Sequence, residues 1–273
     1  MVFESILNPK EVRDKPWKMF ILGLIYASAG VLLSMWIFPT DPSLSIVFLT
    51  TMASIPILVL ILKIEETENF QKKEYPLIGN HKDVLAIIFF LFIGLLIAFT
   101  TWYLILPQEM VDKVFLAQTN TINSINSNVR VQGSYIQTEF LKIILANNFK
   151  VLFFCLIFSL LYGAGAIFII TWNASVLGTA IGNAIKVNVS DAFSYVSAIP
   201  IGFGQYLLHG IPELIAYFLA GIAGGIISAA VIRHKPSSNK FKEVMLDSID
   251  LIILASIVLI VSGLLEVYIS LGV

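Results

Sequence analysis

The stretch His209-Gly210-Ile211-Pro212-Glu213-Leu214 leads into an apolar segment that extends to Ile232. An apolar helix of about 20 residues is long enough to cross the hydrocarbon core of a bilayer. A histidine and a glutamate stand at the head of this segment, where ionisable side chains are costly unless they are paired or face a wet cavity. The segment therefore predicts a membrane-spanning helix, and the two residues are the first candidates for a functional role.

The composition extends this interpretation to the whole chain. Of its 273 residues, 58% are hydrophobic and only 13% are charged, which is typical of a polytopic helical membrane protein. The net charge of −1 gives no reason to expect nucleic acid as a partner. A single cysteine, Cys155, excludes a disulfide or a cysteine-based metal site within one chain.

Six apolar runs are long enough to span a bilayer: Met19–Phe38, Leu44–Leu62, Val84–Leu106, Val151–Thr171, Ile211–Ile232 and Leu251–Ser270. All four tryptophans fall at the predicted edges of these runs, at Trp17, Trp36, Trp102 and Trp172. Amphipathic rings prefer the membrane interface, so the tryptophans support the predicted boundaries.

The basic residues predict the orientation. The N-terminal segment and the loops 63–83 and 233–250 together hold 12 of the 17 lysines and arginines. Because short cytoplasmic segments are enriched in basic residues, we expect all three on the cytoplasmic side of the plasma membrane. The N-terminus is then inside and the C-terminus outside.

This orientation requires residues 173–210 to cross the membrane once. Four crossings return the chain to the inside near Trp172, yet the run that ends at Ile232 must begin outside. The apolar piece 174–185 spans only about 18 Å as a helix, and a second piece, 193–208, is interrupted by Pro200 and two glycines. We therefore expect a broken crossing, as found at transporter binding sites. The alternative is a short tilted helix followed by an outer loop.

The resulting fold is an all-α transmembrane bundle with about seven crossings, in two parts. Residues 1–83 form an N-terminal hairpin with a cytoplasmic loop, and residues 84–273 form a five-crossing core. In the outer segment 107–150, apolar residues recur at helical spacing. They predict two amphipathic helices, Gln108–Ile125 and Ser134–Asn147, around the turn Asn126-Ser127-Asn128. Such a hairpin can lie on the membrane, form a cap or dock a partner.

His209 and Glu213 are four residues apart, so they share a face if both lie on one helix. Pro212 suits the first turn of a helix, and Gly210 permits a sharp bend before it. Three interpretations stay open: a buried structural cap, a pair that handles protons or cations in a polar cavity, and a role in partner binding or conformational change.

Further polar residues extend the candidate site. Asn173, Lys186 and Asp191 lie in the predicted broken crossing, and Glu266 in the last span is another candidate for a buried carboxylate. No metal, cofactor or catalysis is expected. The pattern H-x-x-x-E lacks the second histidine of the zinc motif H-E-x-x-H, and no nucleophile elbow or phosphate-binding loop is present.

Small residues mark places where helices can approach closely. They form the pairs Gly178-x-x-x-Gly182 and Gly221-x-x-x-Gly225, the latter with Gly224, and the patch Gly163-Ala164-Gly165. These faces predict tight packing within one protomer or, alternatively, a homodimer contact.

From about Phe89 to the C-terminus, the chain resembles the stage II sporulation protein M family of integral membrane proteins. The resemblance rests on Asn147-Asn148, the stretch Trp172-Asn173-Ala174-Ser175-Val176-Leu177-Gly178, and the stretch His209 to Leu214 leading to Ala220-Gly221. It implies a five-crossing core without known catalysis, in which the His-Gly…Glu motif is the signature.

Two functions follow as hypotheses. The resemblance implies a non-enzymatic scaffold that organises membrane or envelope machinery by remodelling the membrane or recruiting a partner. The expected partners are the lipid bilayer, a second copy of the chain, and a protein bound at the outer hairpin 107–150. The alternative is a carrier for a small solute, ion or lipid, in which the broken crossing and the His209–Glu213 pair form the site.

Overall fold

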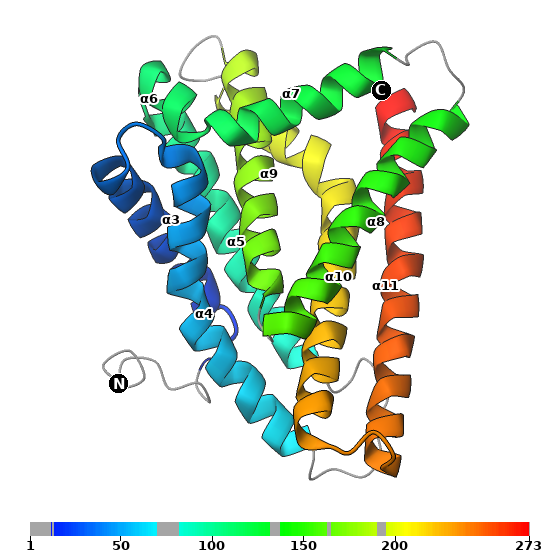
Figure 1. The fold of residues 1–273 in the computed structure, drawn as a ribbon. Helices are drawn as coiled ribbons and strands as arrows, with labels where there is room; N and C mark the ends of the chain where they lie inside the picture. The colour runs from blue at the N-terminus through cyan, green and yellow to red at the C-terminus, as the bar shows by residue number, and fades with distance from the viewer. Residues whose placement is uncertain are drawn as a thin grey trace.

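The computed structural model describes residues 12, 14–69, 82–131, 137–162, 165–189 and 195–272, and these ranges are helical apart from short connections. The helices are α3 (Lys18–Ile37), α4 (Pro42–Asn69), α5 (Lys82–Ile105), α6 (Gln108–Val114), α7 (Leu116–Val131), α8 (Gln137–Tyr162), α9 (Ala166–Asn188), α10 (Tyr195–Arg233) and α11 (Asn239–Gly272) (Figure 1). The predicted all-α class is confirmed.

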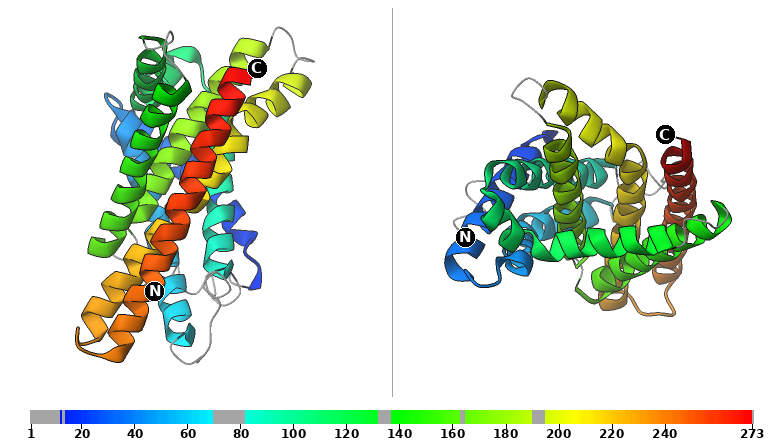
Figure 2. Two further views of the ribbon diagram at one scale, coloured as in Figure 1. Left: turned by 90° about the vertical axis from the view of Figure 1, so that its right-hand side faces the viewer. Right: turned by 90° about the horizontal axis from the view of Figure 1, so that it is seen from above.

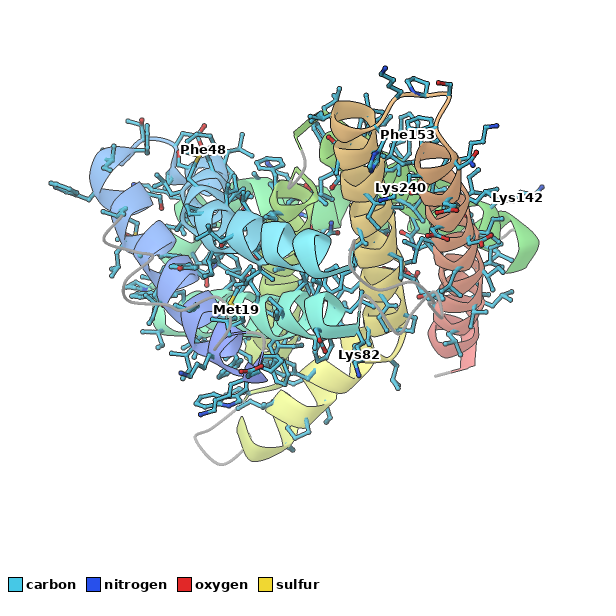
Figure 3. The ribbon with its side chains drawn as sticks, turned by 90° about the horizontal axis from the view of Figure 1, so that it is seen from below. Met19, Phe48, Lys82, Lys142, Phe153 and Lys240 are labelled. Carbon is cyan, nitrogen blue, oxygen red and sulfur yellow. The ribbon has the colours of Figure 1, made fainter. Side chains whose placement is uncertain are left out.

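Seven of the described helices are long and apolar enough to cross a membrane, as predicted. Their candidate spans are Lys18–Ile37, Pro42–Ile61, Lys82–Ile105, Leu141–Leu161, Ala166–Asn188, Gly210–Ile232 and Asn239–Val267. Successive spans run in opposite directions, so the start of α3, the start of α5 and the α10–α11 connection lie at one end of the bundle (Figure 1). Figure 3 shows that end, with Lys82 and Lys240 labelled. Helices α6 and α7 lie at the opposite end.

The predicted fourth span, Val151–Thr171, is wrong. Helix α8 ends at Tyr162 and α9 begins at Ala166, so a turn falls inside that run. A Cβ atom added at Gly165 would lie 2.2 Å from the Phe158 carbonyl oxygen, which shows how closely the two helices approach at the turn. Hydropathy cannot distinguish such a small-residue turn from a continuous apolar helix. Gly163 lies outside the described residues, and Trp172 lies inside α9 rather than at a span edge.

The predicted broken crossing is not confirmed. The fifth crossing is α9, which is continuous from Ala166 through Asn173 and Asn183 to Asn188. This helix has the lowest mean hydropathy of the seven spans but the largest buried share. Its polar side chains Thr171, Ser175 and Thr179 are buried against other helices, so a helix of low hydropathy can cross without breaking.

The outer segment also differs from the prediction. Helix α7 continues through Asn126-Ser127-Asn128, and the break in the chain's helical path comes earlier, at Phe115. Residues 137–147 are not a separate amphipathic helix because they form the first part of α8, which continues into its span. Asparagine and serine favour turns, but this preference is weak and the surrounding structure overrides it.

Glycines set the contacts between helices. Gly23 of α3 faces the α5 backbone at Gly94, and Gly178 and Gly182 of α9 face Phe99 and Tyr103 of α5. Gly221 faces Ala166 of α9 and Ser159 of α8, whereas Gly224 faces the α8 backbone at Leu156. Gly225 is half-buried. Gly178, Gly182, Gly221 and Gly224 therefore pack within one protomer.

The Gly224 contact gives a test of this packing. A Cβ atom at Gly224 would lie 2.4 Å from the Leu156 carbonyl oxygen, so α8 and α10 must separate to admit a side chain. We expect Gly224→Val to lower the free energy of unfolding by about 1–3 kcal/mol or more, measured by thermal melts in detergent. Gly204, also in α10, has nothing within 4 Å of such an atom, so Gly204→Ala is the matched control. Equal melting temperatures for the two variants would contradict the close contact.

Candidate functional site

A polar contact joins α8 to α10 at the signature glutamate. The Asn148 side chain of α8 donates a hydrogen bond from Nδ2 to Oε1 of Glu213, 65 residues further along the chain. Asn148 is only 6% exposed, and its own Oδ1 accepts a hydrogen bond of 3.4 Å from Asn147 Nδ2. Two parts of the sequence that carry the family resemblance therefore meet in space.

A second carboxyl group completes this cluster. Glu266 of α11 is partly buried and interacts electrostatically with Glu213. Tyr217, one turn after Glu213 on α10, is 3% exposed and interacts with both carboxyl groups. We call Asn148, Glu213, Tyr217 and Glu266 the acidic cluster. It brings together three helices, α8, α10 and α11, that lie side by side in both views of Figure 2.

The acidic cluster lies near one end of the candidate spans. Glu213 is three residues after the start of its candidate span, Gly210–Ile232, and Glu266 is one residue before the end of Asn239–Val267. At 1.5 Å per residue, both are within about 5 Å of a span end. Asn148 lies deeper in Leu141–Leu161, about 10 Å from its start. These span ends belong to the end of the bundle opposite the basic segments.

The signature motif lies inside α10 rather than at the start of a helix. The helix begins at Tyr195, so Pro212 and Gly210 do not form the predicted first turn and bend. Pro212 has no N–H group, so the Leu208 carbonyl loses its partner in the helix, which favours a bend. Figure 2 shows the first part of α10 inclined to the remainder. Helix α10 contains two prolines, Pro200 and Pro212, and each removes a hydrogen bond within the helix.

His209 and Glu213 share one continuous helix at a spacing of four residues, as the predicted pair requires. The side chain of His209 lies outside the described residues, so the pair itself stays a prediction. Gly210 is buried and approaches Leu177 of α9, whose Cδ2 atom would lie 3.8 Å from an added Cβ.

Lys186 belongs to a different cluster. Its Nζ atom lies 4.8 Å from the centroid of the Tyr103 ring and donates a hydrogen bond of 3.4 Å to Gln108 Oε1. The Tyr103 hydroxyl in turn donates to Asn183 Oδ1 at 3.5 Å, and Gln108 Nε2 donates to Asp112 Oδ1 at 2.7 Å. These contacts tie α5, α6 and α9 together, so Lys186 has a structural role and does not face Glu213.

Asn173 does not join the acidic cluster by any described hydrogen bond. Its Nδ2 atom donates to the Ile169 carbonyl oxygen of its own helix at 2.8 Å. Asp191 lies outside the described residues. The predicted polar residues therefore do not form one site. The sequence analysis did not identify Tyr217 as a member of the acidic cluster. Asn148 carried the resemblance but was not recognised as the hydrogen-bond partner of Glu213. Its position beside Asn147, ahead of a strongly apolar run, was the available signal.

The chemistry available in the acidic cluster is limited. Carboxyl oxygens accept hydrogen bonds and exchange protons, and the Asn148 amide supplies a donor. Among the described residues, no group of three or more histidine, cysteine, aspartate or glutamate side chains is placed to hold a metal ion. Cys155 is buried on α8. The hydrogen bond holds α8 to α10, and two carboxyl groups that interact across α10 and α11 can respond to a change in charge.

Comparison with known proteins gives one result. The family model described as stage II sporulation protein M matches residues 86–271, which include α5 to nearly the end of α11. The match contains the whole acidic cluster and excludes α3 and α4. No curated protein and no solved structure matches the chain.

A double-mutant cycle tests the Asn148–Glu213 contact. Asn148→Leu should destabilise the protein by about 1.5–3 kcal/mol, because it leaves the carboxyl group without its donor. Combined with Glu213→Leu, the loss should fall short of the sum of the single losses by about 0.5–3 kcal/mol. Glu213→Gln keeps an acceptor and should cost less than Glu213→Leu.

Asn173→Leu combined with Glu213→Leu is the matched control and should be additive, because Asn173 bonds to its own helix. The same cycle with His209→Ala tests the predicted His209–Glu213 pair. Additive losses for Asn148 and Glu213 in thermal melts would show that the contact contributes nothing specific.

Proposed function

Because the chain belongs to the stage II sporulation protein M family, we propose that this multi-pass membrane protein is a non-enzymatic scaffold in the plasma membrane. It organises membrane or envelope machinery by presenting α6 and α7 to a protein partner outside the cell. The proposal rests on how α6 and α7 are attached to the transmembrane bundle. They form a polar element that is fastened to the bundle at one end and extends across it (Figure 1).

The fastening is made by buried residues around the α6–α7 junction. Val111, Val114 and Phe115 are buried, and the Phe115 ring packs edge to face against Tyr103 of α5 at 5.4 Å between centroids. Gln118 is 0% exposed and donates hydrogen bonds to the Ser43 carbonyl oxygen of α4 and to Ser175 Oγ of α9. A partner bound to α7 would therefore transmit force directly to the membrane bundle.

The free surface of α7 suits a partner that forms hydrogen bonds. Leu116 is 49% exposed, and Asn120, Asn123 and Ser124 on the same helix are exposed. The surface is polar and uncharged over these residues, and α7 is not among the helices able to cross a membrane. A polar rim around one apolar side chain is a common composition for protein interfaces.

The position of the acidic cluster favours a scaffold over a carrier. Transporter sites usually lie near the bilayer midplane on discontinuous helices, whereas Glu213 and Glu266 lie near the ends of their candidate spans and α9 is continuous. The carrier remains a second candidate because two carboxyl groups from different helices interact in the bundle. Proton uptake into proteoliposomes separates the two: a carrier gives uptake that Glu213→Gln abolishes, and a scaffold gives none.

A homodimer is also part of the proposal, but its contact must use other surfaces than first expected. Gly178, Gly182, Gly221 and Gly224 are occupied within the protomer. The lipid-facing side of α3, which includes exposed Ile25 and Leu32, is one such surface.

The orientation is testable by labelling of single cysteines in a Cys155→Ser background. The basic residues at one end of the bundle favour the inside. A cysteine at Lys240 should react with an impermeant maleimide only after permeabilisation, and a cysteine at Asn120 should react without it. Both positions are exposed. Labelling of a cysteine at Lys240 in intact cells would show that the orientation is the opposite of the proposed one.

Site-specific photo-crosslinking tests the docking role of α7. A photoreactive residue at Asn120 or Asn123 should give a discrete cross-linked protein in cells of the native organism. The matched control is Phe153 on α8, which is 55% exposed on an apolar helix and should give only lipid adducts. The double variant Asn120→Lys, Asn123→Lys should not form the cross-link when the photoreactive residue is placed at a neighbouring position of α7. Its melting temperature should be unchanged. The same products at Phe153, or no product at α7, would contradict the proposal.

A further inference from the structure

One lysine lies well inside a membrane span. The seven candidate spans contain seven lysines and no arginine. Six of these lysines lie within three residues of a span end: Lys18, Lys82, Lys142, Lys186, Lys240 and Lys242. Lys150 is nine residues after Leu141 and eleven before Leu161, the two ends of its span. Because a charged side chain inside a span is costly, this position marks a candidate for function.

Lys150 points away from the helix bundle. One side of α8 packs against other helices and consists of buried residues: Asn148, Leu152, Cys155 and Ser159. Lys150, Phe153 and Phe154 are exposed and lie on the opposite side of the helix. Since the outer side of a membrane-spanning helix faces lipid, Lys150 reaches the lipid and not the acidic cluster.

The chain supplies no negative charge beside Lys150. Side chains three or four residues apart on a helix are neighbours, and those of Lys150 are Ala146, Asn147, Phe153 and Phe154. None of them is acidic, and Lys150 forms no ion pair with any residue in the described part of the chain. The ammonium group therefore needs an anion from outside the protein.

The depth of Lys150 matches the headgroup region of a bilayer. On α8 the strongly apolar sequence begins at the next residue, Val151. Side chains of a helix lean toward its N-terminus, which for α8 lies at the same end of the bundle as α6 and α7 (Figure 1). The long lysine side chain can therefore extend toward the membrane surface. The polar headgroups of phospholipids lie at that level.

Asn147 supplies a second hydrogen-bond donor one turn before Lys150. Its side chain is exposed, and its Nδ2 atom donates one hydrogen to Asn148 Oδ1 at 3.4 Å. A primary amide has two such hydrogens. The contact with Asn148 orients the amide, and the second hydrogen is left for an acceptor on the lipid-facing side.

Aromatic rings continue from Lys150 toward the middle of the span. The Phe153 and Phe154 rings lie 6.0 Å apart between centroids, and the Phe154 and Phe158 rings are stacked at 6.0 Å. A cation near the surface followed by apolar rings has the same order as a phospholipid, in which the phosphate precedes the acyl chains.

We propose that this side of α8 binds one anionic phospholipid. The phosphate pairs with the Lys150 ammonium group and accepts a hydrogen bond from Asn147, and an acyl chain lies against the Phe153 and Phe154 rings. A zwitterionic lipid carries its own cation beside the phosphate, which weakens its attraction to Lys150. A lipid of net negative charge therefore fits best. The site is separate from the α7 surface proposed to bind a protein.

Native mass spectrometry of the full-length protein in detergent tests the site, with dioctanoyl phosphatidylglycerol as the probe. The wild-type protein should bind one lipid saturably. Lys150→Gln should weaken binding about tenfold or more, the equivalent of one hydrogen bond to a charged group, and should leave the melting temperature unchanged because the position is exposed. Lys150→Arg should retain binding. Lys113→Gln is the matched control, because Lys113 is exposed on α6 at the same end of the bundle, and it should bind like the wild type.

Several outcomes would overturn the inference. A lack of saturable binding by the wild-type protein decides the question whatever the variants do. Equal affinities of the wild type and Lys150→Gln would show that the lysine does not recognise the lipid, and an equal loss in Lys113→Gln would show a general effect of charge. Equal binding of dioctanoyl phosphatidylcholine would contradict the preference for net negative charge. Competition by inorganic phosphate at the same concentration would identify a site for free phosphate instead of a lipid.

Discussion

The bilayer supplies no hydrogen-bond partners, so every polar group of α9 must be satisfied inside the protein, and much of the architecture follows from this constraint. Some side chains bond to their own helix, as Asn173 does to Ile169 and Thr179 to Ser175. Others need neighbours: Thr100 of α5 donates to the Gly178 carbonyl oxygen, and Gln118 of α7 contacts Ser175. Helices α4, α5, α7 and α10 all pack on α9, which makes it the centre of the bundle.

The second organising contact lies on the other side of α10. There the Asn148–Glu213 hydrogen bond joins α8 to α10, and Glu266 of α11 lies near the same carboxyl group, close to one end of the candidate spans. The Phe92–Phe218 contact, at 6.3 Å between ring centroids, connects α10 back to α5. The signature glutamate thus ties α8 to α10 at the same end of the bundle as α6 and α7.

The sequence could predict the all-α class and the number of crossings, because long apolar runs and basic loops each extend over many residues. It could predict the family, because the signature residues can be recognised in the sequence. It could not place the end of α8 at Tyr162 and the start of α9 at Ala166, since the residues between them are as apolar as a helix interior. The predicted broken crossing over residues 173–210 is not confirmed, because α9 is continuous to Asn188 and hydropathy measures the side chains and not their enclosure. Within the site, the spacing of His209 and Glu213 was informative, but the contact with Asn148 spans 65 residues and no local pattern encodes it.

The architecture depends on α9 crossing the membrane as one continuous helix packed against α5. Disulfide formation in native membranes tests it most directly. Added Cβ atoms at Gly178 and Gly182 would lie 2.9 Å from the Phe99 Cβ and 3.0 Å from the Tyr103 Cβ. In a Cys155→Ser background, Phe99→Cys with Gly178→Cys, and separately Tyr103→Cys with Gly182→Cys, should each cross-link under mild oxidation, whereas Phe99→Cys with Phe168→Cys should not. The two positions on α9, 178 and 182, are one helical turn apart, so both pairs should cross-link. If only one pair or neither pair cross-links, α9 is not a continuous helix packed against α5.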